Sequence, residues 1–140
     1  MGGRGDSAAG GFSKSLVQAT VYHGTNVADI TKFSTGGKES NGAIFFANDP
    51  DYAEEEAYVK AERGGERTLY EVKLNIRNPQ EVTLSGSQFA DPATEAKYIR
   101  AAKAAGHDAV IFHGSDGFSD QTFYAVFSPK QVKIKNKKKL

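Results

Sequence analysis

Three consecutive residues at the end of an apolar stretch, His23, Gly24 and Thr25, have the groups of a small ligand-binding site. The imidazole of His23 can donate a hydrogen bond to a ligand hydroxyl, and Thr25 adds a second polar side chain. Gly24 has no side chain, so a ligand amide can approach its backbone N–H and C=O closely. The three residues therefore predict a site that recognises an amide and a hydroxyl. A buried structural histidine is the alternative.

Aromatic side chains follow in the next predicted strand, GAIFFAN over residues 42–48. Phe45 and Phe46 are neighbours, so one faces the core and the other is available to a ligand. Tyr58, in the helix expected next, can supply a second ring, with core packing as its alternative role. A hydrogen-bonding histidine, an amide clamp and two aromatic rings suit a flat ring that carries an amide. Nicotinamide is such a ring.

Several short strands and two helices are expected to position these side chains. Asp49-Pro50 and Asp91-Pro92 each supply an N-cap followed by a proline for the first helical turn. Gly64 and Gly106 mark the helix ends. Short apolar or alternating segments predict strands over residues 15–23, 42–48, 68–76, 81–84, 108–112, 123–127 and 131–135. Few strand–helix–strand units occur, so this order predicts an α+β fold with mainly antiparallel pairing.

The composition fits one ordinary soluble domain within the 140 residues. We expect a flexible leader over 1–13, the domain over 14–135 and a basic tail over 136–140. Eighteen basic and seventeen acidic residues leave a net charge of +1, which gives no reason to expect nucleic acid or an anionic membrane as the main partner. The chain has no cysteine, and its three histidines lack close ligand spacing, so no metal site is expected.

The start of the chain lacks the apolar segment of a signal peptide. No stretch approaches the length of a membrane span. We therefore expect a monomeric, cytoplasmic protein, in a bacterial cytosol or in a host cytosol after delivery.

Three segments in this order resemble the three motifs of the ADP-ribosyltransferase superfamily, in the branch with a His-Tyr-Glu triad: VYHGT at 21–25, GAIFFANDPDYA at 42–53 and YAVFSPKQVKI at 124–134. That branch includes the diphtheria-toxin class and the poly(ADP-ribose) polymerases. The resemblance extends over about residues 17–135 and is greatest to the small domains of phage and mobile-element polyvalent proteins. It implies two packed, mainly antiparallel sheets with flanking helices and NAD in the cleft between them, with no metal.

The resemblance also implies roles for single residues. His23 would bind a ribose hydroxyl of NAD, the Gly24 backbone would hold the nicotinamide carboxamide, and Thr25 would support the same pocket. Phe45 takes the place of the triad tyrosine and could still pack against nicotinamide. The second stacking tyrosine of the family falls at Glu56, and Tyr58, two residues later, is expected to take its part in preference to Tyr52.

The third motif departs most from the family pattern. The glutamate of the triad falls at Phe123, while Gln121 lies two residues earlier on the same face of the strand. Some toxins of the family have a glutamine at that spacing that helps to select the acceptor, so Gln121 is the candidate catalytic residue; a solvated loop glutamine is the alternative. Cleavage of the nicotinamide bond passes through an oxocarbenium-like state, which a carboxylate stabilises. A neutral glutamine can only orient the ribose.

We therefore expect an enzyme, a toxin-like effector that cleaves the nicotinamide–ribose bond of NAD and transfers ADP-ribose to a macromolecular acceptor or to water. The alternative is a weak or inactive module that binds NAD or ADP-ribose, because Phe123 replaces the glutamate. An RNA 2′-phosphotransferase of related fold also begins with a similar motif, but it needs further histidine and arginine residues to bind phosphate. A domain that only docks a larger protein is a further alternative, but no feature of the sequence supports it.

Overall fold

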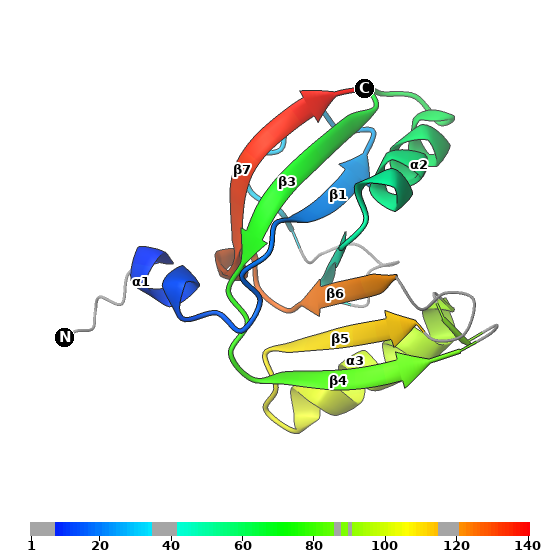
Figure 1. Ribbon diagram of the computed structural model, residues 1–140. Coiled ribbons are helices and arrows are strands. Elements are labelled where there is room, and N and C mark those ends of the chain that lie inside the picture. Colours follow the sequence, from blue (N-terminus) through cyan, green and yellow to red (C-terminus); the bar gives the residue numbers. More distant parts are fainter. Residues whose placement is uncertain (1–7, 35–41, 86–87, 90, 115–120) are drawn as a thin grey trace.

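The computed structural model describes residues 8–34, 42–85, 88–89, 91–114 and 121–140. These residues form three α-helices and seven strands (Figure 1). In chain order the elements are α1 (Ala8–Ser13), β1 (Val21–Thr25), β2 (Ile44–Ala47), α2 (Pro50–Ala61), β3 (Thr68–Leu74), β4 (Pro79–Leu84), α3 (Pro92–Ala104), β5 (Ala109–Gly114), β6 (Thr122–Val126), a 3₁₀ helix (Pro129–Gln131) and β7 (Val132–Lys139).

The strands of the described residues form one sheet in the order β4-β5-β6-β2-β1-β3-β7. All neighbouring strands pair antiparallel except β4 and β5, which are parallel. The predicted α+β class and mainly antiparallel pairing are confirmed. The expectation of two separate, packed sheets is not, because hydrogen-bonded pairing continues from one half of the molecule to the other.

The sheet is nearly divided between β1 and β2, whose register contains a single residue pair, Tyr22 with Ala47. Beyond Tyr22, β1 continues along β3 as far as Thr25, while β2 continues along β6. The two strands therefore diverge where the His23-Gly24-Thr25 segment begins. Figure 1 shows the result: β1, β3 and β7 run steeply, whereas β4, β5 and β6 run across the molecule.

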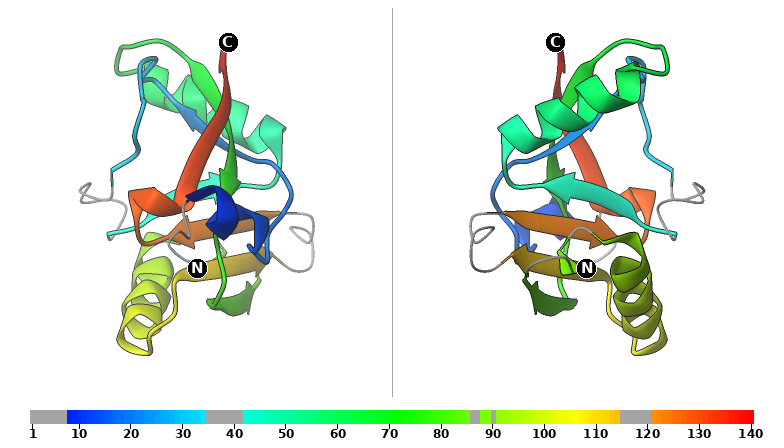
Figure 2. Two further views of the ribbon diagram at one scale, coloured as in Figure 1. Left: turned by 90° about the vertical axis from the view of Figure 1, so that its left-hand side faces the viewer. Right: turned by 90° about the vertical axis from the view of Figure 1, so that its right-hand side faces the viewer.

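Two helices flank this division. In the right-hand view of Figure 2, α2 lies by the upper half of the sheet and α3 by the lower half, with β2 between them. Asp49 caps α2 by accepting a hydrogen bond from the backbone N–H of Asp51, and Asp91 caps α3 by accepting one from Thr94. Both start with the predicted proline in the first turn. Ala53 and Ala57 form the buried stripe of α2, as their four-residue spacing predicts.

The core lies on both faces of the sheet, and β2 separates its two parts. Ile44 and Phe46 belong to a cluster with β1, β3 and the segment after β1. Ala43 and Ala47 belong to a second cluster under α3, and Phe45 packs against it. Phe46 is only 2% exposed, so strand alternation placed one phenylalanine in the core, as expected, and left Phe45 on the other face.

Two segments near the start of the chain differ from expectation. The supposed flexible leader contains α1 (Ala8–Ser13). The first strand starts at Val21 instead of residue 15, because the Ser15 hydroxyl and the backbone at Leu16 bond to Ile76 instead of to a sheet ladder. Residues 1–7 lie outside the described part of the chain.

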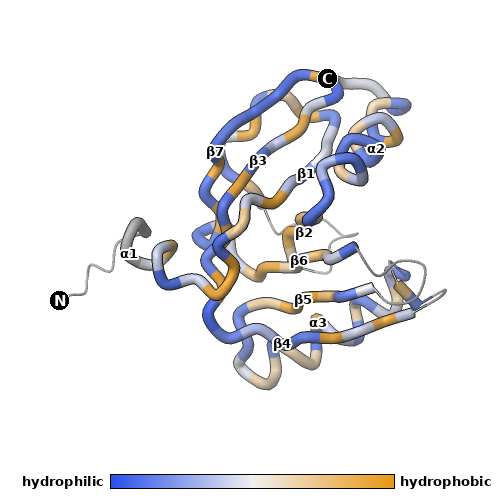
Figure 3. The backbone as a smooth tube through the Cα atoms, viewed as in Figure 1, coloured by the Kyte–Doolittle hydropathy of each residue, from blue (hydrophilic) through white to orange (hydrophobic). Residues whose placement is uncertain are grey.

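The expected basic tail is largely part of β7, an edge strand that pairs with β3 up to Lys139 opposite Thr68. Its lysines are all exposed: Lys133, Lys135, Lys137, Lys138 and Lys139. Figure 3 shows this strand mostly in the hydrophilic colour, in contrast to β5. Pairing with β3 gives these residues a fixed strand conformation.

The close packing of α2 on β1 gives a first prediction. A Cβ built on Gly24 would lie 1.7 Å from the backbone oxygen of Ala53, so Gly24→Ala must push the helix away. We expect a loss of about 1–3 kcal/mol in the free energy of unfolding, measured by chemical denaturation. Gly11→Ala is the control, because the nearest neighbours of its Cβ would be the flexible ends of the Asn75 and Arg77 side chains, which can move aside. Equal stability of the two variants would contradict the packing described.

Candidate active site

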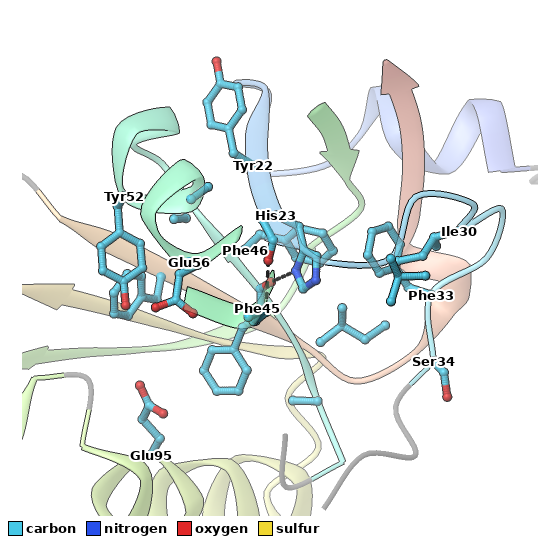
Figure 4. Close-up of a pocket in the computed structure, with 18 of the residues that line it drawn as sticks. Tyr22, His23, Ile30, Phe33, Ser34, Phe45, Phe46, Tyr52, Glu56 and Glu95 are labelled. Carbon is cyan, nitrogen blue, oxygen red and sulfur yellow. Dashed lines mark hydrogen bonds between the residues drawn. The ribbon is translucent and has the colours of Figure 1, made fainter. Parts of the chain in front are cut away.

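A pocket of about 840 Å³ opens where β1 and β2 diverge. It is lined by β1, β2, the segment after β1, one face of α2, and one residue each of β6 and α3 (Figure 4). The buried Tyr70 holds the segment after β1 in place: its hydroxyl donates to the Val27 carbonyl and accepts from the N–H of Ile30. This places Ile30 and Phe33 in the pocket wall.

His23 bridges the divergence of the strands. Its Nδ1 lies 2.8 Å from the carbonyl oxygen of Phe45 on β2 (Figure 4). Its ring packs edge-on against Phe33, with centroids 5.0 Å apart, and at a tilt against Phe46 at 5.5 Å. The bond from β1 to β2 thus connects the strands at the place where their backbone ladder ends.

The surroundings of His23 determine its protonation state and its tautomer. Burial, followed by the positive charge of Lys60, lowers the pKa of His23 from 6.5 to about 4, although the Phe45 carbonyl acts in the opposite direction. The ring is therefore neutral at physiological pH. A carbonyl oxygen only accepts, so Nδ1 carries the proton and Nε2 is an acceptor. His23 is thus suited to accept from a ligand hydroxyl, whereas the sequence suggested that it donates.

Gly24 also lines the pocket, but Thr25 does not. The Gly24 carbonyl accepts a hydrogen bond of 2.8 Å from Nζ of Lys60 on α2. Thr25 is only 6% exposed, and its hydroxyl accepts from the backbone N–H of Val27 at 3.4 Å, which stabilises the turn after β1. Of the first motif, the structure therefore brings His23 and Gly24 together in the pocket.

Phe45 lies in the pocket, with its ring stacked on Phe112. Tyr58 does not line it: the ring is 47% exposed and lies under the guanidinium of Arg67. The pocket tyrosine of α2 is Tyr52. The resemblance places its second tyrosine at position 56. Residues four apart share a helix face, so Tyr52 lies beside Glu56, whereas Tyr58, two residues from Glu56, faces away. The four-residue spacing from position 56 was the signal that could have identified Tyr52.

The third motif contributes an aromatic side chain. Phe123 lines the pocket at 5% exposure and packs against Tyr52, with ring centroids 4.9 Å apart, and Phe89, at 4.7 Å. Gln121 is not among the lining residues. Its Nε2 donates to Oδ2 of Asp49 at 2.9 Å, and its buried Oε1 has no hydrogen-bond partner among the described residues. Gln121 thus connects β6 to the cap of α2.

Two carboxyl groups complete the pocket, Glu56 from α2 and Glu95 from α3. Tyr52 lies beside Glu56, and burial, followed by the negative charge of Glu56, raises the pKa of Tyr52. Burial, then the negative charges of Asp91 and Glu56, raises the pKa of Glu95 from 4.5 to about 7. Glu95 was not a candidate from sequence, because nothing in the order of residues indicates that α3 faces α2.

The family model described as "ADP-Ribosyltransferase in polyvalent proteins" matches residues 18–139. The chain belongs to this family. The match includes all seven strands of the described residues and both helices that line the pocket, so the family resemblance predicted from three short motifs is confirmed. Comparison with curated proteins gives no match.

Neither a membrane span nor a metal cluster is found within the described residues. These residues contain no helix that is long and apolar enough to cross a membrane. They also contain no group of three or more histidine, cysteine or acidic residues arranged to hold a metal ion.

The lowered pKa of His23 predicts a pH dependence of stability. Between about pH 6.5 and 4 the unfolded chain binds a proton at this histidine and the folded domain does not, so stability falls as the pH falls through this window. Relative to His23→Gln, the wild type should lose on the order of 3 kcal/mol between pH 7 and pH 4. Denaturant titrations at both pH values measure this, and His107→Gln should keep the wild-type dependence.

Proposed function

We propose that the domain uses NAD as the donor of ADP-ribose. It would cleave the bond between nicotinamide and ribose and pass ADP-ribose to a macromolecular acceptor or to water. The observation that carries the proposal is the bond from His23 to the Phe45 carbonyl, which orients a neutral imidazole with an acceptor nitrogen at the divergence of β1 and β2. A ribose hydroxyl is the natural donor to that nitrogen.

The other lining residues support a flat, amide-bearing ring as the ligand. Phe45 and Tyr52 offer aromatic surfaces for nicotinamide. The Gly24 backbone can bind the carboxamide, in competition with Lys60 for its carbonyl. Displaced from that carbonyl, Lys60 can join Lys32, which also lines the pocket, as a positive charge for the pyrophosphate of NAD.

Bond cleavage itself makes modest demands on the protein. Nicotinamide is positively charged while attached, so it leaves with the bonding electron pair and needs no proton. The positive charge that develops on the ribose needs a nearby negative group and exclusion of water. The buried aromatic wall formed by Phe33, Phe46 and Phe123 supports the exclusion of water.

A second candidate function is binding of NAD or ADP-ribose without turnover. Phe123 favours it, because an apolar ring occupies the place of the family's glutamate and packs tightly with Tyr52 and Phe89. Gln121, which we predicted to replace that glutamate, holds Asp49 and does not line the pocket. Its catalytic role stays a prediction.

Nicotinamide release from NAD tests the proposed function. We expect release by the wild type and a loss of at least about 10²-fold in His23→Ala, because the variant loses the group that orients the ribose. The matched control is His107→Ala, whose ring lies on the surface against the Asn78 carbonyl and should leave the rate unchanged. Heat stabilisation by NAD without release would instead favour the binding module. Neither release nor stabilisation would reject NAD as the ligand.

The two tyrosines of α2 provide a matched pair for ligand affinity. Tyr52→Ala removes an aromatic surface of the pocket, whereas Tyr58→Ala removes a ring that lies outside it. We expect NAD affinity, measured by calorimetry, to fall about tenfold in Tyr52→Ala and to stay at the wild-type value in Tyr58→Ala. The reverse order would support the stacking role that the sequence suggested for Tyr58.

A further inference from the structure

Two carboxyl groups from different helices line one pocket, and Phe123 stands in the third motif where the family pattern has a glutamate. Glu56 and Glu95 both line the pocket, and Figure 4 shows them pointing toward one another beside Phe45. The negative charge of Glu56 acts on Glu95, so the two groups interact electrostatically. Like charges in a partly buried site oppose each other and cost free energy, and such an arrangement is typical of functional sites.

We propose that Glu56 and Glu95 together supply the carboxylates of the reaction, in place of the third-motif glutamate whose position Phe123 occupies. This inference rests on the proposed function, because it names further catalytic residues for the same reaction. The proposed carboxylates come from α2 and α3, whereas the glutamate of the family pattern falls on β6, at Phe123.

Glu56 is the group suited to stabilise the positive charge on ribose. Glu56 projects from α2, which packs closely on β1 at Gly24, and it lies beside Tyr52, whose ring packs against Phe123. The same pocket contains Phe45, the surface proposed for nicotinamide, so a ribose attached to that ring lies within the field of Glu56. A carboxylate that is oriented before the reaction needs little reorganisation when the charge develops.

Glu95 is suited to assist the attack of the acceptor. As the C1′–N1 bond breaks and its electron pair goes to nicotinamide, the acceptor oxygen forms a bond to C1′ in the same step. The acceptor's proton passes to the carboxylate of Glu95, which releases it to solvent, so the rate of nicotinamide release includes this proton transfer. A general base works best when its pKa is near the working pH. The charged and titratable groups that act on or lie beside Glu95 are Asp91, the N-cap of α3, and Glu56 and Tyr52 on α2.

The experiment compares Glu56→Gln and Glu95→Gln with the wild type, with Glu55→Gln as the control on the exposed side of α2. For each protein, nicotinamide release is measured from pH 5 to 9, and NAD affinity by calorimetry. We expect release to fall about 10²–10³-fold in Glu56→Gln, with NAD affinity within a few fold of the wild type. Glu95→Gln should lose about 10²-fold and lose the rise in rate that the wild type shows around pH 7.

Thermal unfolding separates these effects from misfolding. Folding raises the pKa of Glu95, so the folded domain holds this proton between about pH 4.5 and 7 and loses stability as the pH rises through that range. Glu95→Gln removes this loss and should melt at or above the wild-type temperature at pH 8. Reduced turnover in a variant of at least wild-type stability supports a direct role in catalysis.

The outcomes separate the inference from the proposed function. Wild-type release rates in both glutamine variants, together with loss of release in His23→Ala, would reject the carboxylate pair and keep the enzyme. NAD binding by the wild type without any release would reject the pair and favour the binding module. Absence of both binding and release in the wild type would reject the pair together with the use of NAD.

Discussion

The arrangement of the whole pocket depends on one weak junction in the sheet, the single pair between Tyr22 and Ala47. A continuous ladder would bring β1 and β2 together along their length and leave no opening between them. Here the ladder stops after one pair, and the His23 side chain replaces further backbone bonds by donating to the Phe45 carbonyl. A catalytic candidate thus also serves as the connection between the halves of the sheet.

Packing around this junction keeps it open. Gly24 allows the α2 backbone to approach β1 so closely that no side chain would fit, which fixes the face of α2 that carries Tyr52 and Glu56. On the other side of β1, the ring of Phe33 contacts both His23 and Tyr70. His23 is therefore held from two directions, and its burial follows from the same contacts that lower its pKa.

Local sequence signals predicted most elements and half of the site. The Asp-Pro caps, the alternation that separates Phe45 from Phe46, and the His23-Gly24 pair are short-range features, and each is found in the structure. Glu95 could not be predicted, because its place in the pocket depends on how α3 packs against the sheet opposite α2. Tyr58 was preferred to Tyr52 because it lies beside the alanine stripe of α2, but a step of two residues from Glu56 reverses the helix face. The number of sheets was misjudged because one pairing suffices to join two differently oriented halves.

β7 gives the open end of this sheet a particular character. An unpaired strand edge offers its backbone groups to any other strand, including one from a second copy of the same chain. Five exposed lysines on β7 place like charges along that edge, so two copies that approach edge to edge repel each other. Among the described residues no helix covers this edge and no further strand pairs with β7, so the charge of the lysines is what opposes pairing with another strand. This repulsion weakens as salt screens the lysines.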